Sequence, residues 1–481
     1  MPATAFVNNI RADLFDANTV YVALDNHKYG DFKPYLYKST NKGKTWKSIT
    51  GNIPDRHLIW RMVQDHVKSD LLFAATEFGI YFTLDGGGNW MKLSGGAPTI
   101  AFRGITIQRE WNDLVAASFG RGFFILDDIS VLREIDEEKL KAEGTLFSTR
   151  QADWYSPRSI VSSQVSAQYA APNPEFGATF TYYLSEGYTT MESERKKKER
   201  EAAKNGQDIL FPGWDALEAE KEEVKPQVFI TIKDKEGNVV RRLNGRTNKG
   251  LHRINWDLMY ASKRPVNPSR AGQGGFGGRS WGGMPAMPGT YTATLSKMID
   301  GTITELSGPV SFEVVPLREG ALEGASPEKM LAFGKKVEAF YNDYSVVNYM
   351  MENSMGRVNA LQIALSRADE TPGELVSELY NLNKRMMDIQ DEMEGNSAKE
   401  EVGERNNPTI RSRMFVGMRG MRSTYGPTPN QEQSMDAAIA DLAKLKPQIE
   451  KIYNEDLPQL EQKIMKAGAP WIEGSLIPKN E

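Results

Sequence analysis

The fold of this chain is decided by the stretch STNKGKTW at residues 39–46, which recurs as TLDGGGNW at residues 83–90. Both follow the pattern Ser/Thr-x-Asp/Asn-x-Gly-x-Thr/Asn-Trp. The pattern suits a tight turn between two strands, because Asp or Asn accepts hydrogen bonds from turn amides and Gly tolerates a positive φ. The indole then packs over the end of the hairpin. The residues expected to build the two turns are Ser39, Asn41, Gly43, Thr45, Trp46, Thr83, Asp85, Gly87, Asn89 and Trp90.

The spacing of the two turns predicts a repeated β unit. Trp46 and Trp90 are 90 − 46 = 44 residues apart, which is close to the length of one four-stranded β-propeller blade. Apolar strands at 20–23, 71–75 and 114–117 each precede a turn and a second strand. We therefore predict a partial β-propeller of about three blades in residues 1–133. The outer hairpin of the third blade is expected to be absent or altered, because no third copy of the motif follows it.

Three blades do not close a ring, since propellers have about four to eight blades. An inner strand is predicted almost at the start of the chain, at residues 5–10. Because the edges of an incomplete ring would be exposed, we expect this chain to be the C-terminal portion of a longer protein whose upstream segment carries the missing blades. The alternative is an independent small sheet of three repeats.

Composition excludes several classes of function. The formal net charge of the 481 residues is −4, which gives no electrostatic case for nucleic-acid binding. The absence of cysteine excludes disulfides, thiol catalysis and Cys-ligated metals, and four histidines leave little for a zinc site. No cofactor and no metal site are predicted. No apolar run reaches the roughly 20 residues of a membrane helix, so no membrane span is expected, and residues 1–20 carry no signal peptide.

The middle of the chain changes composition twice. Residues 134–225 are predicted to be an irregular connector, in which the mixed charges and helix formers of 192–204 favour a solvated helix. Residues 226–317 alternate as short strands separated by turns, which predicts an Ig-like β-sandwich. The glycine-rich run at 272–283 lacks the Lys-Ser/Thr and the helix of a phosphate loop, so it is predicted to be a flexible loop.

Apolar residues take up a helical period in the last part of the chain. From Met330 to Leu365 they recur at alternating steps of three and four, and the pattern returns at 375–393 and 435–452. Such heptad seams predict helices that pack on one another. We predict an antiparallel helical hairpin or three-helix bundle over residues 326–467, with the Arg- and Met-rich segment 411–422 as a solvated link. The predicted fold class is therefore multidomain, with β units followed by an α unit.

The turns that lie away from the Trp motifs bring polar groups to one face of the propeller. In a propeller, the turns between second and third strands share a face with the links between blades. This places Asp25, Asp31 and Glu77 on one face as catalytic candidates for glycoside hydrolysis, which needs two carboxyl groups roughly 5 to 10 Å apart. The candidates for ligand binding there are His27, Lys28, Tyr29, Arg61, Arg103 and Arg121. The structural interpretation is that the acids satisfy turn amides and that Arg121 pairs with Glu77.

The repeat also carries a family resemblance. The motif at 39–46 and 83–90 is known as the Asp-box. Together with TEFG at 76–79 and FGRGF at 119–123, it resembles the bacterial sortilin-like BNR/Asp-box repeat proteins, which are often labelled glycosyl hydrolases. The segments GNVVR at 237–241 and WDL at 256–258 resemble the Ig-like domain of flagellar hook-capping proteins. The resemblance implies a secretion signal and further blades upstream, and a periplasmic, outer-surface or secreted location for the full-length protein.

Two functional hypotheses follow from this resemblance. Asp-boxes occur in sialidases, xyloglucan-degrading enzymes, sortilin-type receptors and photosystem assembly factors, so they indicate a fold and leave the activity open. The first hypothesis is a non-catalytic binding or scaffold protein of the bacterial envelope or exterior, whose propeller presents a protein- or glycan-binding face. The alternative is a glycoside hydrolase of the sialidase or xyloglucanase type, with its carboxylates on the face opposite the Asp-boxes. In that case this portion alone is expected to be inactive.

Overall fold

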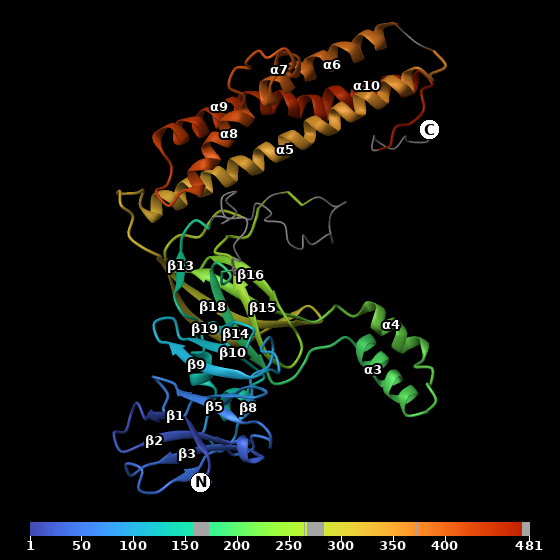
Figure 1. Ribbon diagram of the computed structural model, residues 1–481. Helices are drawn as coiled ribbons and strands as arrows, with labels where there is room; N and C mark the ends of the chain where they lie inside the picture. Colours follow the sequence, from blue (N-terminus) through green and yellow to red (C-terminus); the bar gives the residue numbers. More distant parts are fainter. Residues whose placement is uncertain (158–172, 264, 267–282, 371–372, 474–481) are drawn as a thin grey trace.

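The computed structural model is a mixed β and α protein (Figure 1). It describes residues 1–157, 173–263, 265–266, 283–370 and 373–473. Within these residues the strands form five sheets, and the C-terminal part is helical. Residues 272–282 of the glycine-rich run, predicted as a loop, lie outside the described residues.

Three antiparallel sheets follow one another along the first part of the chain. Sheet 1 has the strand order β1-β2-β3-β4, sheet 2 has β5-β6-β7-β8, and sheet 3 has β11-β10-β9. In the described segment 102–157, no fourth strand follows β11 in sheet 3. The strands are β1 (Phe6–Ala12), β2 (Val20–Asn26), β3 (Asp31–Ser39), β4 (Lys47–Ser48), β5 (Ile59–Gln64), β6 (Leu72–Thr76), β7 (Gly79–Thr83), β8 (Met91–Lys92), β9 (Phe102–Gln108), β10 (Asp113–Ser118) and β11 (Phe123–Leu126).

These three sheets pack face to face in chain order. Alternate side chains of sheet 1, including Tyr21 and Leu36, share one apolar core with Ile59 and Met62 of sheet 2. The opposite side chains of sheet 2 share a second core with sheet 3. Alternation in each strand sends successive side chains to opposite faces, so sheet 2 buries both of its faces. All five residues of β6 are accordingly buried.

Short helices connect sheet 3 to the next unit. Helix α1 (Val131–Glu134) is held to sheet 2 by Arg133, whose guanidinium donates to both carboxylate oxygens of Asp65 at 2.9 Å. Asp65 is fully buried just after β5. Burial alone would raise the pKa of Asp65, but the hydrogen bond from Arg133 lowers it below its usual range. Helix α2 (Glu137–Lys141) follows, capped by the side chain of Asp136.

Two further sheets pack as two layers around a buried Trp256. Sheet 4 has the order β12-β14-β17, and sheet 5 has β13-β19-β18-β15-β16. Their shared core includes Phe180, Tyr182 and Phe312. The strands are β12 (Gly144–Leu146), β13 (Ala152–Trp154), β14 (Ala178–Leu184), β15 (Gln227–Asp234), β16 (Val239–Gly245), β17 (Gly250–Trp256), β18 (Gly289–Ile299) and β19 (Thr302–Pro316).

The segment predicted as an irregular connector contributes to both of these layers. It provides β12, β13 and β14. In β14, Phe180, Tyr182 and Leu184 alternate into the core, and this strand pairs with β17. The charged part forms the helices α3 (Met191–Lys204) and α4 (Trp214–Glu222), which project from the β layers as a hairpin (Figure 1). No residue of α3 or α4 is buried.

The C-terminal helices share one apolar core. The ten residues of the predicted seam are all buried in the 39-residue helix α5; they are Met330, Phe333, Val337, Phe340, Tyr344, Val347, Met351, Val358, Leu361 and Leu365. The predicted link 411–422 differs, because Ile410, Met414 and Met418 are buried at helical spacing and form helix α8. The helices are α5 (Pro327–Leu365), α6 (Gly373–Glu394), α7 (Ser397–Glu401), α8 (Ile410–Arg419), α9 (Pro429–Lys451) and α10 (Leu457–Lys466), with a π-helical turn at Ile452–Asp456 between α9 and α10.

Among the described helices, none combines the length and the apolar composition that a membrane crossing requires.

Candidate functional site

Turns and links of sheets 1, 2 and 3 meet on one face. We call this surface the aromatic face and define it by His57, Trp60, Glu77, Phe78, Arg103 and Phe119. Trp60 and Arg103 stand on the first strands of sheets 2 and 3. The others come from the link between sheets 1 and 2, the β6–β7 turn and the β10–β11 turn. Phe119 is 72% exposed, and Phe78 is also exposed.

Arg103 lies at the centre of the aromatic face. Its guanidinium carbon is 3.4 Å from the centre of the Trp60 ring and 5.4 Å from that of Phe119. The Trp60 indole donates to Glu77 Oε2 at 2.9 Å, and the same oxygen is 3.7 Å from Arg103. The Trp60 ring and the Glu77 carboxylate thus both contact the guanidinium. The Arg103 side chain is 43% exposed.

The arginines predicted on this face differ in their contacts. Arg61 Nε donates to the carbonyl of Arg103 at 3.0 Å, so Arg61 and Arg103 lie together. Glu77 forms its ion pair with Arg103, and in the described residues no ion pair joins Glu77 to Arg121. Arg121 is exposed, and its backbone N–H donates to Ser118 in the β10–β11 turn.

The other predicted residues lie toward sheet 1. Asp25 is buried and its carboxylate contacts Nδ1 of His27, whose ring is 5.9 Å from that of Trp60. The Lys28 ammonium lies 4.6 Å from the centre of the Phe6 ring, and Tyr29 stacks on the same ring at 6.4 Å. The structure therefore brings Asp25 and His27 close to the aromatic face and places Lys28 and Tyr29 beside β1.

Asp31 is engaged by its own turn. It accepts hydrogen bonds from Tyr35 at 2.6 Å and from Asn26 at 3.4 Å, as well as from the backbone of Lys33. The bond from Tyr35 lowers the pKa of Asp31. Burial and the hydrogen bond to Asp31 together raise the pKa of Tyr35 to about 12. All three carboxylates proposed as catalytic therefore already have protein partners.

The Asp-box turns close through short-range hydrogen bonds. In the first, Ser39 Oγ accepts from Gly43 N at 2.9 Å and Asn41 Oδ1 accepts from Thr45 N at 2.9 Å. The second repeats this arrangement with Thr83 and Asp85. Burial opposes ionisation of Asp85, but bonds from Thr83, Asn89 and the backbone hold its pKa well below the usual range. These side chains are committed to the turns.

Sequence reasoning missed the aromatic members of this face. Phe78 and Phe119 each precede a glycine in the corresponding turn of sheets 2 and 3, at Phe78-Gly79 and Phe119-Gly120. That repeated Phe-Gly pair was the available signal. The position of Trp60 beneath Arg103 depends on packing between sheets and has no local signal.

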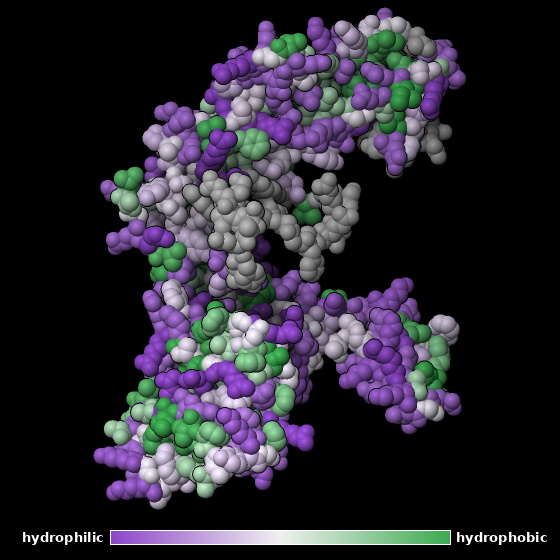
Figure 2. All heavy atoms as spheres, in the orientation of Figure 1, coloured by the Kyte–Doolittle hydropathy of each residue, from purple (hydrophilic) through white to green (hydrophobic). Residues whose placement is uncertain are grey.

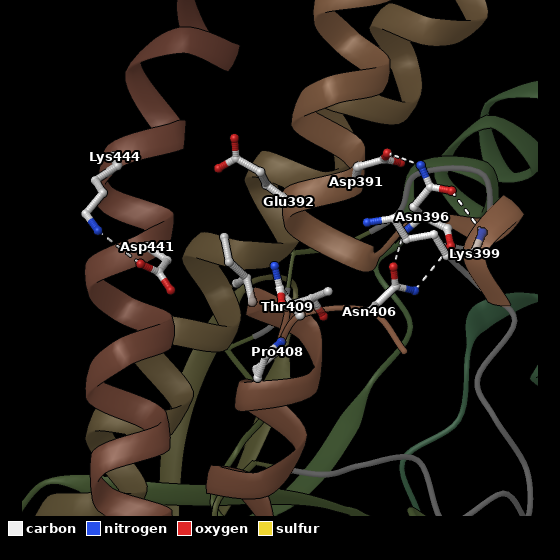
Figure 3. Close-up of a pocket in the computed structure, with 11 residues that line it drawn as sticks. Asp391, Glu392, Asn396, Lys399, Asn406, Pro408, Thr409, Asp441 and Lys444 are labelled. Carbon is white, nitrogen blue, oxygen red and sulfur yellow. Dashed lines mark hydrogen bonds and ion pairs between the residues drawn. The ribbon is translucent and has the colours of Figure 1, made fainter. Parts of the chain in front are cut away.

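A polar cavity of about 340 Å³ lies among the helices (Figure 3). It is bordered by Asp391 and Glu392 at the end of α6, by the loop around Asn396 and Asn406, and by Asp441 and Lys444 of α9. Several lining groups pair with one another, as Lys444 does with Asp441 at 3.1 Å and Asn396 with Asp391 at 2.5 Å. Small-molecule sites are mostly apolar with a few polar groups, which this cavity does not resemble.

Metal binding has no support in the part of the chain that the structure describes. Those residues contain no group of three or more His, Cys, Asp or Glu side chains arranged to hold a metal ion.

Comparison with known proteins gives little further guidance. No protein family matches the chain, and no curated protein matches it. Similar solved structures include the extracellular domain of a hybrid two-component system of B. thetaiotaomicron (10% identity, TM-score 0.21, 64% of this chain and 32% of that one). They also include PorZ, a surface component of the type-IX secretion system of Porphyromonas gingivalis (11% identity, TM-score 0.22, 64% of this chain and 39% of that one). A third is the GH74 xyloglucanase of Xanthomonas campestris (9% identity, TM-score 0.22, 68% of this chain and 40% of that one).

The chain spans about two fifths or less of the length of these three structures. At such TM-scores the likeness carries no inference about the fold or the activity of this chain.

Proposed function

We propose that this protein is a non-catalytic binding or scaffold protein of the bacterial envelope or exterior. In this proposal sheets 1 to 3 are three blades of an incomplete Asp-box β-propeller, sheets 4 and 5 form an Ig-like sandwich, and the helices form a bundle. The aromatic face binds a glycan or a protein segment. The resemblance to bacterial BNR/Asp-box proteins supports the location outside the cytoplasm.

One observation carries the proposal: the partly exposed Arg103 guanidinium contacts the Trp60 ring and lies near the Phe119 ring, while the neighbouring acids have protein partners. Exposed rings beside a guanidinium are typical anchors of binding surfaces. Glycoside hydrolysis would instead need a carboxylic acid whose pKa is raised so that it can protonate the leaving group. The hydrogen bond from Tyr35 shifts Asp31 in the opposite direction.

The test is binding of the full chain to a glycan array and to a displayed peptide library. We expect a ligand whose affinity falls about tenfold or more in Phe119→Ala and in Arg103→Ala, as for anchors of a binding surface. Trp214→Ala is the matched control, since Trp214 is an exposed aromatic residue on α4. Steady turnover of a bound glycan that is abolished by Glu77→Gln or Asp31→Asn would contradict the proposal.

A further inference from the structure

Sheet 3 differs from sheets 1 and 2 at the outer edge of its third strand. In sheets 1 and 2 a short fourth strand pairs with the third, as β4 does with β3 and β8 with β7. Among the described residues, β11 pairs with β10 alone, and no strand lies along its other side. We call that side the free edge of β11. Such an edge presents backbone N–H and C=O groups that can pair with another chain.

The fourth strands of sheets 1 and 2 are held by the same backbone bond. Ile49 N donates to Leu36 O of β3 at 2.9 Å, and Leu93 N donates to Ile80 O of β7 at 2.8 Å. In each case the donor is an apolar residue that comes three positions after the Asp-box tryptophan. The fourth strand therefore follows the pattern Trp-x-x-Ile or Trp-x-x-Leu.

Phe123 of β11 corresponds to Ile80 of β7. In sheet 2, Thr76 Oγ1 donates at 2.8 Å to the carbonyl of the glycine before Ile80. In sheet 3, Ser118 Oγ donates at 2.9 Å to the carbonyl of the glycine before Phe123. Because backbone groups alternate between the two sides of a strand, Phe123 and Ile125 direct theirs to the free edge. In the part of the chain that the structure describes, no backbone bond reaches this edge.

The free edge of β11 lacks the features that usually keep an edge strand from pairing. The four residues of β11, FFIL, include no charge and no proline. By contrast, β4 and β8 at the edges of sheets 1 and 2 each carry a lysine. Phe123 is 75% exposed and Ile125 is 61% exposed. In Figure 2, hydrophobic side chains lie exposed over the sheets in which β1, β5 and β9 are labelled in Figure 1. The strand β11 is therefore suited to accept an added strand.

We propose that the free edge of β11 binds an extended segment of a partner protein with the pattern Trp-x-x-Leu or Trp-x-x-Ile. The segment adds to sheet 3 as its fourth strand. The amide of its Leu or Ile donates to the Phe123 carbonyl, as Leu93 does to Ile80. The side chain of that residue covers Phe123, just as Leu93 shares a core with Ile80 in sheet 2.

The free edge adjoins the aromatic face without using its side chains. An added strand runs antiparallel to β11, as β8 does to β7, so its C-terminal end points toward the turn that carries Phe119. The inference rests on the proposed binding function, because it names a protein segment as a ligand. It extends that function from the side chains of the aromatic face to the backbone of a neighbouring strand.

The test uses a synthetic peptide with the sequence of residues 88–95, GNWMKLSG, which contains the fourth strand of sheet 2. The labelled peptide is titrated with the full chain and followed by fluorescence anisotropy. We expect saturable binding that is about tenfold weaker or more in Ile125→Pro, because proline removes a donor from the free edge and leaves the pairing with β10 intact. Ile125→Val is the matched control, since valine keeps the N–H, and it should bind within about twofold of the wild type.

A modified peptide gives a second measurement that does not depend on the folding of a variant. Methylation of the leucine backbone nitrogen removes the donor to Phe123, so the methylated peptide should bind about tenfold more weakly or worse. Equal affinity of the methylated and parent peptides would overturn the inference, as would unchanged affinity in Ile125→Pro or the absence of saturable binding.

Self-association is the remaining outcome. A dimer of the full chain in sedimentation analysis that is lost in Ile125→Pro would identify a second copy as the occupant, and this would also overturn the inference. The aromatic face is tested separately, by Arg103→Ala and Phe119→Ala with other ligands. Failure of one proposal is therefore distinguishable from failure of the other.

Discussion

At the residue scale, the two Asp-box turns carry a neutral side chain and a charged side chain at the same position of the motif. Asn41 and Asp85 hold equivalent positions and accept equivalent backbone bonds. The pKa of Asp85 is depressed in the folded state, so its contribution to stability is present above the unfolded value of about 4 and is lost as the pH falls toward the folded value. We expect Asp85→Asn to remove this loss of stability at low pH. Urea unfolding midpoints from pH 6 to pH 2 should fall less in Asp85→Asn than in the wild type.

The control for this exchange is Asp85→Ala. Alanine removes the side-chain acceptor of the exposed turn amides of Gly88 and Asn89, which water can then hydrate, so we expect a loss of about 0.5 to 1.5 kcal/mol at neutral pH. Asp85→Asn should cost little at that pH, because Asn41 performs the same role in the first turn. Equal acid sensitivity of the wild type and Asp85→Asn would show that Asp85 is not the titrating group.

The sequence could predict the local contacts of these residues but not their contacts between sheets. The turn bonds of Ser39, Asn41 and Asp85 join residues at most four apart, so the local pattern specifies them. Glu77 and Arg103, by contrast, are 26 residues apart in the sequence, and their contact joins sheet 2 to sheet 3. Its alternative, Glu77 with Arg121, was equally consistent with the sequence. Only the packing of sheet 3 on sheet 2 chooses between the two arginines.

At the element scale, α1 depends on the buried pair Asp65–Arg133. Removing one partner of a buried ion pair leaves an uncompensated charge, which costs about 3 to 5 kcal/mol. We therefore expect Arg133→Met to lower the free energy of unfolding by about 3 kcal/mol, measured by urea denaturation. Lys141→Met is the control, because Lys141 and Glu137 form an exposed pair in α2. That change should stay within about 0.5 kcal/mol, and an equal loss in both variants would contradict the argument.

Helix α5 tests the heptad seam directly. Leu361 is buried in the helical core, whereas Ile363 two residues later is exposed. Truncating a buried leucine costs about 2 to 5 kcal/mol, and surface changes usually stay within about 0.5 kcal/mol. We expect Leu361→Ala to destabilise the helices by that larger amount and Ile363→Ala to be neutral. Circular dichroism at 222 nm during urea unfolding measures both, and comparable effects would mean that the seam does not set the packing.

Elements differed in how well the sequence predicted them. The seam of α5 was visible because a helix repeats its buried face every three or four residues within one segment. Strand β14 has a clear alternation, but the residues with which it pairs in β17 lie between 250 − 184 = 66 and 256 − 178 = 78 residues later, so the sequence could not assign it to a sheet. Helix α8 was obscured because three of its ten residues are arginines and one is a glycine, although Met414 and Met418 keep the helical spacing.

At the scale of the whole molecule, the β layers and the helices have separate cores. The helical core draws all its members from residue 333 onward, and the core of sheets 4 and 5 ends at Val314. The connection between them, residues 317–325, includes the exposed Leu317 and Leu322. In Figure 1 the helices lie beyond the β layers at one end of the molecule. Units with their own cores unfold independently when little surface joins them.

Calorimetry of the full chain should therefore show more than one thermal transition. Leu361→Ala is expected to lower only the transition of the helices. Phe180→Ala, which empties a fully buried position between sheets 4 and 5, should lower only a β transition, because losing a buried phenylalanine costs about 3 to 5 kcal/mol where it is packed. Far-ultraviolet circular dichroism during the same heating assigns the helical step. If both substitutions moved one common transition by similar amounts, the two cores would be thermodynamically coupled, and the helices would have to be treated as part of the β scaffold.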